Sequence, residues 1–263
     1  MSDDARAALP CRVCGETTRR LFDGPLLDLR VGYHDCPRCG YVQTDPPNWL
    51  ARAYGEAINR SDTGILRRNA RNARLVMRVM DVLGVLHGRV VDCAGGYGLL
   101  VRMLRDAGVD ALWRDPYCEN LVARGFEHAG EPAALVTAFE AMEHFVEPPG
   151  ELDALMALGD AVLVSTDLIA DPAPAPGTWW YYGAEHGQHI GFFRPQTLRW
   201  LAARAGWHLH SDGRSFHLFT RAPLPDWRWR WARGSLRLAG LVARLRLRSR
   251  VWTDHAAMSR PAP

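Results

Sequence analysis

The chain has 263 residues, of which 48% are hydrophobic and 23% charged, and its formal net charge is +3. These proportions are typical of a soluble globular protein and indicate neither a disordered chain nor a membrane span, and the net charge is too small by itself to indicate a polyanionic partner. The start "MSDDARAALP" has no apolar stretch of the kind found in secretory signals, and no run approaches the roughly 20 apolar residues of a membrane span, so we expect a cytoplasmic protein.

Two C-x-x-C pairs stand near the start of the chain. Cys11 and Cys14 are followed, after 21 intervening residues, by Cys36 and Cys39, and a glycine comes directly after each pair. Four thiolates at this spacing in a reducing compartment indicate a tetrahedral zinc site more than disulfides or two unrelated pairs. Because four thiolates leave no open coordination position, we expect the zinc to be structural, in a module that covers residues 1–48.

A helical region follows the linker "TDPPN" at residues 44–48, where two consecutive prolines break regular structure. Helical periodicity begins near Trp49 and is strongest from Ile65 to Leu86, where apolar residues recur on one face and arginines on the other. We assign residues 49–88 to a helical lid or linker.

From residue 89 onward, predicted strands alternate with predicted helices. Strands are expected at residues 90–93, 111–115, 134–140, 161–167, 207–211 and 215–221, with helices at 99–108, from 119, at 151–158 and at 195–206. This order predicts an α/β fold with a Rossmann-like, doubly wound, mostly parallel sheet that ends in an antiparallel hairpin, in addition to the small N-terminal zinc module.

A glycine-rich turn follows the first of these strands, in "VVDCAGGYG". Asp92 ends the strand, and Gly95, Gly96 and Gly98 allow the backbone to turn tightly and to approach a ligand before the next helix. The second strand ends in an acid, Asp115, roughly 20 residues further on, where a carboxylate can accept hydrogen bonds from both hydroxyls of a ribose.

In these features the chain resembles the class I S-adenosylmethionine-dependent methyltransferases. Their first motif, an acid followed by alternating glycines, matches the glycine turn, with alanine in place of the first glycine; the second matches Asp115; and "FEAMEHFVEPP" resembles the stretch after their fourth strand. The resemblance covers roughly residues 65–220, and we assign 89–222 to the methyltransferase domain. It implies S-adenosylmethionine as cofactor, bound by Asp92, Ala94, Gly95, Gly96, Gly98, Asp115, Pro116, Tyr117 and Glu140.

The zinc knuckles ending in "CGYVQTDPP", together with "DTG" and "GGYG", resemble a bacterial subgroup of this family associated with deoxysugar and polysaccharide genes. That subgroup includes sugar C-methyltransferases that act on nucleotide-linked 4-keto sugars. The resemblance implies a methyl acceptor that is a sugar, a glycan end or a related small hydroxylated metabolite, as in sugar and natural-product biosynthesis.

The stretch "WWYYGAEHGQHIGFF" contains the candidate catalytic residues. A neutral histidine can remove the acceptor's proton, so we take His189 as the first choice for a general base and His186 as the second, with Glu185 as an orienting group. The C-methyltransferases have a Y-x-E-H run here, and Gln188 stands where they have the glutamate. The competing interpretation is that these histidines only fasten a loop and that the aromatic residues at 179–182 pack a core instead of stacking on a sugar or on the methyl sulfonium.

Two residues of "FEAMEHF", Glu143 and His144, are weaker candidates that would reach the cofactor or the substrate, or would only cap local structure. The tail, residues 223–263, is basic: nine arginines and a single acid lie between Arg221 and Arg250. It would either contact a membrane surface peripherally or fold back on the domain with its arginines solvated, and the alternation in "RLRLRSRV" favours a strand and the second arrangement.

Two other functions compete with methylation of a sugar-like acceptor. Zinc modules and basic tails also occur in RNA methyltransferases, although the net charge gives no strong nucleic-acid signal. A non-catalytic scaffold that binds S-adenosylmethionine without turnover is the third reading, which the intact glycine turn and paired acids do not by themselves exclude.

Overall fold

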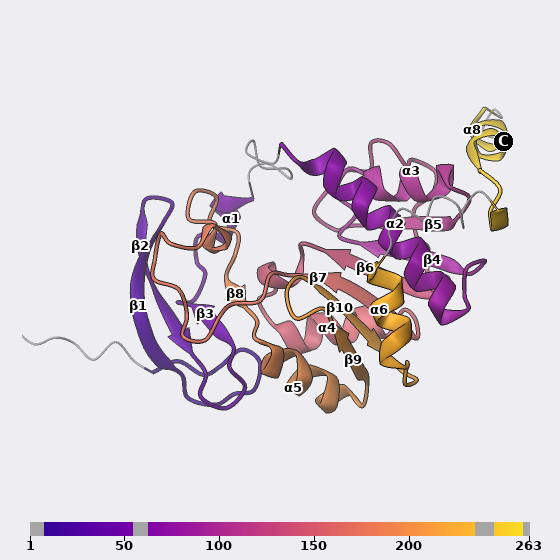
Figure 1. Cartoon of the computed structure of the whole chain (residues 1–263). Coiled ribbons are helices and arrows are strands. Elements are labelled where there is room, and N and C mark those ends of the chain that lie inside the picture. The colour runs from indigo at the N-terminus through magenta and orange to yellow at the C-terminus, as the bar shows by residue number, and fades with distance from the viewer. Residues whose placement is uncertain (1–7, 55–62, 235–244, 260–263) are drawn as a thin grey trace, which may run out of the picture. The chain divides into compact units, whose positions relative to one another are not determined.

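The computed structural model describes residues 8–54, 63–234 and 245–259 (Figure 1). The chain divides into two compact units. Unit 1 consists of Met1–Glu56, Glu140–Asp153 and Ser165–His217, and unit 2 consists of Ala57–Phe139, Ala154–Val164 and Leu218–Pro263. Each unit is therefore assembled from three separate segments of the chain.

Unit 1 contains a four-stranded sheet that the sequence did not reveal. Its strands are β1 (Arg19–Leu26), β2 (Leu29–Asp35), β3 (Val42–Thr44) and β8 (Gly191–Phe192), in the order β1-β2-β3-β8. The first three come from the expected zinc module, and β8 pairs antiparallel with β3 through Val42 with Phe192 and Gln43 with Gly191. A Cβ atom on Gly191 would lie 1.8 Å from the Tyr41 hydroxyl, so only glycine fits at this position.

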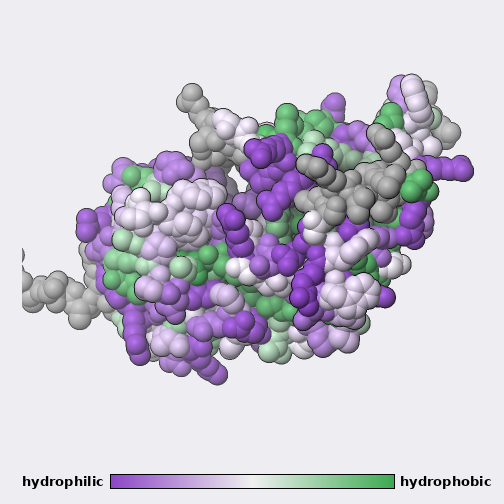
Figure 2. All heavy atoms as spheres, viewed as in Figure 1, coloured by the Kyte–Doolittle hydropathy of each residue, from purple (hydrophilic) through white to green (hydrophobic). Residues whose placement is uncertain are grey.

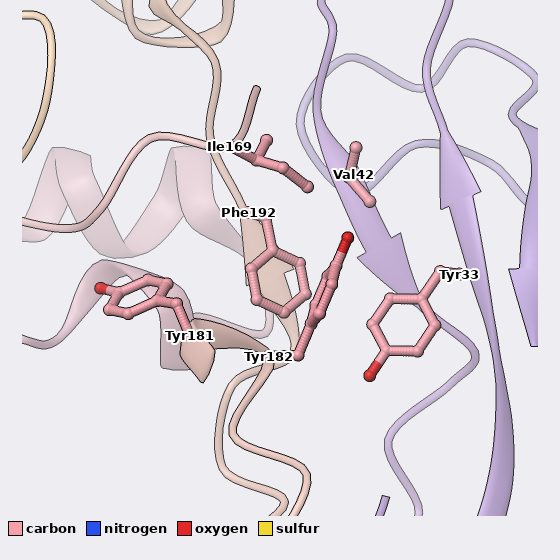
Figure 3. Packing of buried hydrophobic residues seen from close by; sticks show 6 residues of the cluster. All are labelled: Tyr33, Val42, Ile169, Tyr181, Tyr182 and Phe192. Carbon is pink, nitrogen blue, oxygen red and sulfur yellow. The ribbon is translucent and has the colours of Figure 1, made fainter. Parts of the chain in front are cut away.

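An aromatic cluster holds the segment before β8 against this sheet. Tyr33 of β2 and Phe192 of β8 contact Tyr182, with Tyr33 and Tyr182 at a centroid distance of 5.1 Å (Figure 3). Burying a large apolar side chain contributes roughly 1.5–3 kcal/mol, so this cluster is a substantial part of the stability of unit 1. Beside it, Trp49 donates its indole N–H to the Gly187 carbonyl at 2.8 Å, next to the short helix α1 (Leu50–Ala53).

The second sheet has six strands in the order β5-β4-β6-β7-β10-β9. These are β4 (Arg89–Cys93), β5 (Asp110–Arg114), β6 (Leu135–Phe139), β7 (Ala161–Ser165), β9 (His208–Ser211) and β10 (Phe216–Thr220). Strand β4 is parallel to β5 and β6, and every residue of β6, β7 and β10 is buried, as in a sheet covered on both faces. Strands β9 and β10 are neighbours joined by a four-residue turn, which only an antiparallel pair allows. The predicted α/β fold is confirmed.

Four helices lie near the positions predicted from the sequence or contain its candidate residues, and a short 3-10 turn contains Glu143 and His144. They are α2 (Ile65–Leu83), α3 (Leu99–Asp106), α4 (Pro148–Met156), α5 (Pro195–Ala205) and the 3-10 turn η1 (Met142–His144). Helix α2 ends at Gly84, whose φ of 76° is a left-handed C-terminal cap. Arg67, Arg71 and Arg74 on the first half of α2 are exposed. Figure 2 shows hydrophilic side chains over the start of this helix.

One arginine of α2 departs from the predicted solvated face. Arg78 is fully buried, its guanidinium lies 3.3 Å from the centroid of Trp231, and it donates to the Trp231 carbonyl at 2.8 Å. Trp231 belongs to α6 (Asp226–Gly234), so a cation–π contact binds this part of the tail to α2 within unit 2.

The helix expected from residue 119 does not form. The Asn120 side chain accepts the Ala123 N–H at 2.9 Å and donates to Glu127 at 2.7 Å, and Gly125 has a φ of 86°. Side-chain bonds to the local backbone thus replace a helical turn, a competition that asparagine often wins.

The strand predicted for "RLRLRSRV" is also wrong in its described part; Arg244 lies outside the described residues. Residues 247–250 have no regular structure, and α8 (Val251–Met258) follows. The Asp254 carboxylate of α8 accepts hydrogen bonds from Arg105 and Arg102 of α3, and these charge-assisted bonds hold the helix on unit 2. The tail therefore folds back where it is described. Across residues 8–54, 63–234 and 245–259, each helix is too short or too polar to cross a membrane.

Candidate functional site

The glycine turn of unit 2 runs from β4 into α3 as predicted. Gly96 and Gly98 have φ values of 50° and 87°, in the left-handed region that other residues rarely adopt. A Cβ atom on Gly95 would lie 2.4 Å from the Trp113 ring, whereas one on Gly96 would meet nothing within 4 Å. The turn is thus closed against β5 at Gly95 and open at Gly96, which suits the close approach of a ligand.

Asp115 is tied to this turn directly after β5. Its carboxylate accepts the Gly96 N–H and the Tyr117 N–H, each at 2.9 Å, and the Trp113 indole N–H donates to the Gly96 carbonyl at 2.8 Å. Each carboxylate oxygen retains a lone pair, so Asp115 keeps acceptor capacity for further hydrogen bonds. Pro116 and Tyr117 follow, and the Tyr117 side chain is 84% exposed.

Asp92 lies beneath the turn. It is buried and accepts a hydrogen bond from the Thr137 hydroxyl of β6 at 2.7 Å, and burial raises its pKa to about 7. Its contact with β6 supports the backbone that carries Ala94 and the glycines. A carboxyl in this state is a support for the turn and not an exposed anion.

Glu140 directly follows β6 and has a φ of 51°, which is uncommon for a residue other than glycine. Its N–H donates to the Ser165 hydroxyl at 2.9 Å, and that hydroxyl donates to the Glu140 carboxylate. Both residues belong to unit 1. A strained backbone held by a side-chain bond is a feature of functional sites, and it fits the assignment of Glu140 as a binding residue.

His189 is the centre of a separate polar cluster in unit 1. Its Nδ1–H donates to the Tyr181 carbonyl at 2.6 Å, since a carbonyl can only accept. The neutral ring therefore keeps its lone pair on Nε2. Burial lowers the pKa of His189, which favours this neutral form.

Glu143 lies beside this lone pair. Its Oε1 is 3.9 Å from the His189 Nε2, and neither carboxylate oxygen has a hydrogen bond of normal geometry, although the Tyr181 and Thr166 hydroxyls are near enough to lower its pKa. Burial outweighs them and raises the Glu143 pKa to about 7. The result is a buried carboxyl and an imidazole that can share one proton.

His144 and His186 complete the cluster, with ring centroids 5.0 Å and 4.7 Å from that of His189. The His144 Nδ1 is 2.8 Å from the Tyr54 hydroxyl, and the His186 Nδ1 accepts the Gln188 N–H at 3.1 Å. Burial lowers the pKa of both rings, that of His186 to about 4. Three adjacent neutral imidazoles are thus maintained near pH 7.

Two other residues that the sequence singled out in this stretch, Gln188 and Glu185, make no hydrogen bond to the histidine cluster through their side chains. The Gln188 side chain donates to the Ala53 carbonyl at 2.9 Å, so it fastens the loop. Glu185 is exposed and, within the described part of the chain, makes no hydrogen bond or ion pair with His186 or His189. Tyr181, whose carbonyl fixes the His189 tautomer, had no signal in the sequence beyond its aromatic character.

The four N-terminal cysteines come together as predicted. Their Sγ atoms all lie within 4.8 Å of one another, with Cys11 to Cys39 at 3.6 Å and Cys14 to Cys36 at 3.4 Å. A tetrahedral shell with zinc–sulfur bonds of about 2.3 Å separates its sulfurs by about 3.8 Å, so the set fits zinc. The Thr197 hydroxyl of α5 donates to the Cys39 carbonyl at 2.9 Å, which supports the second knuckle.

The family described as "Methyltransferase domain" matches residues 65–212, more than half of the chain. Among curated proteins, none matches the chain. Similar solved structures include a magnesium protoporphyrin IX methyltransferase from Synechocystis with bound S-adenosylmethionine (16% identity, 66% of this chain and 89% of that one, TM-score 0.42). Human N-acetylserotonin methyltransferase is similar at 14% identity, over 67% of this chain and 66% of that one, with a TM-score of 0.41. An O-methyltransferase family protein from Burkholderia thailandensis is similar at 15% identity, over 66% of this chain and 67% of that one, with a TM-score of 0.41. From the family match and the glycine turn with its tethered acid, we conclude that the chain belongs to the methyltransferase domain family and is an S-adenosylmethionine-dependent methyltransferase.

Proposed function

We propose that this enzyme methylates a sugar, a glycan end or a related small hydroxylated metabolite, and that His189 accepts the proton which the acceptor loses. The observation that carries the base assignment is the hydrogen bond from the His189 Nδ1–H to the Tyr181 carbonyl, which leaves the Nε2 lone pair available. The acceptor class is inferred from the resemblance of the zinc knuckles and the glycine turn to the sugar-associated subgroup.

The cofactor-binding residues are proposed on the geometry of the turn in unit 2. S-adenosylmethionine supplies an electrophilic methyl group when it is bound. Asp115 would hold the ribose hydroxyls, since its two oxygens are already oriented by backbone N–H groups. Gly96 lies open to a ligand, with Gly95, Gly98 and Ala94 shaping the turn and Asp92 supporting it from below. Pro116 and Tyr117 complete the proposed set in unit 2, and Glu140 of unit 1 stays a cofactor-binding residue on the resemblance alone.

The residues of unit 1 would remove one proton from the methyl acceptor. The His189 Nε2 would accept the proton that the acceptor hydroxyl loses, so the imidazole would become a cation, while the bound cofactor would supply the methyl group and leave as S-adenosylhomocysteine. Glu143 is placed to stabilise that cation, because its Oε1 is 3.9 Å from Nε2 and both side chains are buried. His186 is the second candidate base, and Glu185 would act on it only through charge, since it has no bond to it.

We further propose that Cys11, Cys14, Cys36 and Cys39 bind one structural zinc ion. The support is the convergence of four sulfurs without any other acidic or imidazole ligand in the set. The zinc would fix the two knuckles at the base of the unit 1 sheet.

The test is methyl transfer from labelled S-adenosylmethionine to a panel of sugar nucleotides, free glycans and hydroxylated natural products. Transfer to at least one of them, reduced strongly in His189→Asn, is expected. Transfer only to RNA, or cofactor binding without transfer to any acceptor, would contradict the proposed function. Activity that a chelator abolishes while the four-cysteine zinc is retained would assign the His189 nitrogen to a metal instead of to a proton.

A further inference from the structure

A pocket walled by ring side chains lies in unit 1, apart from the His189 cluster. It has a volume of about 180 Å³ and is bounded by the β1–β2 hairpin on one side and by the loop before β8 on the other. Six of the ten residues that line it carry rings: Pro25, Tyr33, Pro176, Trp179, Trp180 and Tyr182.

The floor of this pocket is rigid. Tyr182 is packed edge to face against Tyr33 and Trp179, both at centroid distances of 5.1 Å, and its hydroxyl donates to the Pro174 carbonyl at 2.7 Å (Figure 3 shows Tyr33 and Tyr182). A Cβ atom on Gly24 would lie 2.9 Å from the Tyr33 ring, so the hairpin backbone is in close contact with the floor. A preformed floor of this kind does not have to be ordered when a ligand binds.

Trp180 differs from the floor residues because it is exposed. Its side chain is 73% accessible, and its ring meets Tyr181 edge to face at 5.2 Å. An indole with a solvated face beside a rigid aromatic floor offers a one-sided stacking surface. The floor rings use their faces and edges on one another, so they do not converge as a cage around a cation would require.

The charged residues of the lining limit the chemical class of ligand that this pocket can bind. Glu185 is the single acid in the lining, and among these described lining residues there is no arginine or histidine. A carboxylate accepts hydrogen bonds from hydroxyl groups and repels phosphate. The pocket therefore suits a neutral ring that carries hydroxyl groups and excludes the diphosphate of a nucleotide.

We propose that this pocket is a saccharide subsite, in which a neutral sugar ring stacks on Trp180 and donates hydroxyl hydrogen bonds to Glu185. The inference rests on the proposed function for its biological meaning, because it identifies the part of unit 1 that would recognise a glycan acceptor. In this subsite the protein recognises the carbohydrate itself and not a nucleotide attached to it.

The experiment is saturation-transfer difference NMR on the full chain with the methyl glycosides of glucose, galactose, mannose, rhamnose and N-acetylglucosamine. Saturation of ring C–H protons is expected for at least one glycoside. Trp180→Ala should weaken that binding about tenfold or more, since the variant loses both the aromatic stacking and the apolar area that the indole would bury, and Glu185→Gln should weaken it severalfold. Trp252→Ala is the matched control: this tryptophan of α8 is 78% exposed and lies outside the pocket, so its loss should leave binding unchanged.

Three results would overturn the subsite: no glycoside binding by the wild-type chain, equal binding by wild type and Trp180→Ala, or displacement of the glycoside by tetramethylammonium or uridine diphosphate. The His189→Asn variant separates the two proposals, because this assay involves no methyl transfer. Glycoside binding that persists in a chain without transferase activity on any acceptor would contradict the proposed function and leave the subsite standing.

Discussion

The Nε2 atom of His189 lies 3.9 Å from Oε1 of Glu143, a carboxylate with no exposed surface. The histidine keeps a lone pair on this nitrogen because its other nitrogen donates to a backbone carbonyl. Burial raises the pKa of the carboxyl to about 7 and lowers that of the imidazole, so burial favours the neutral form of each group. A pair of this kind can take up one proton with little cost of reorganisation.

Replacement of His189 by asparagine should remove the base and keep the fold. The asparagine amide can still donate to the Tyr181 carbonyl, but it has no basic nitrogen. We expect kcat to fall about 10²- to 10⁴-fold, the usual contribution of a general base, with unchanged affinity for S-adenosylhomocysteine. His186→Asn is the matched variant and should cost less than about tenfold on the same basis. Equal losses in the two variants, measured by single-turnover methyl transfer, would show that the base assignment is wrong.

The pH dependence of methyl transfer should report the same residue. Because burial lowers the His189 pKa, its neutral form persists below the ordinary imidazole value of 6.5. The rate is therefore expected to be highest above pH 7, to decline below pH 7 as Glu143 takes up a proton, and to fall further as the pH drops through the lowered His189 pKa. A profile of kcat against pH checks this. An acid limb near pH 4 would point to His186, whose pKa burial lowers to about 4.

Glu143→Gln should stabilise the chain at high pH and not at low pH. The folded-state pKa of about 7 exceeds the ordinary 4.5, so between these values the unfolded chain releases a proton that the folded chain keeps, and stability is lost as the pH rises. A shift of this size corresponds to about 3 kcal/mol above pH 7. Urea unfolding at pH 5 and pH 8 should show the gap between variant and wild type widening. The exposed Glu147→Gln should show no such change, and a gap independent of pH would refute the assignment.

Asp115→Asn should weaken cofactor binding selectively. The Asp115 carboxylate accepts two backbone N–H groups and retains acceptor capacity for a diol, and hydrogen bonds to a charged group are worth about 1.5–3 kcal/mol. Titration calorimetry with S-adenosylhomocysteine should show a Kd about 10- to 100-fold higher. Asp106→Asn, at the far end of α3 in an exposed i,i+4 pair with Arg102, is the control and should bind normally. Unchanged affinity in Asp115→Asn would remove it from the binding set.

Loss of one knuckle cysteine should release the metal. Cys14→Ser leaves three thiolates, and zinc contributes most of the folding free energy of small modules of this kind. We expect metal analysis to give one zinc per chain for wild type and much less for the variant, with a lower Tm. Cys118→Ser, outside the cluster, should retain both zinc and Tm. Zinc retained by Cys14→Ser would contradict the four-thiolate site.

The sequence predicted the six-stranded sheet because its signals are local. Apolar strands such as β6 and β7 and the long amphipathic α2 can be predicted from the spacing of their apolar residues. The turn between β4 and α3 can be predicted from its glycines. The convergence of the four cysteines was also predictable, since a ligand set at fixed spacing can be recognised without knowledge of the fold.

The features that sequence reasoning missed depend on contacts between distant residues. Pairing of β3 with β8 joins Val42 to Phe192, and short strands of two or three residues leave no periodic pattern. The burial of Arg78 beneath Trp231 has the same origin, because a helical pattern alone places an arginine in solvent. The tautomer of His189 depends on a backbone carbonyl, which every residue has and no sequence motif marks.

Pairing across so many residues also governs the order in which the chain can fold during synthesis. Phe192 is synthesised 150 residues after Val42. During synthesis, the edge of β3 that later pairs with β8 therefore lacks this partner strand while most of the second sheet is made. Exposed strand edges are sites of unwanted association, and contacts this distant in sequence form slowly. Each unit contains segments from early and late parts of the described chain, so neither can be released by a single proteolytic cut. We expect each unit to reach its final state only after the last of its three segments has been synthesised.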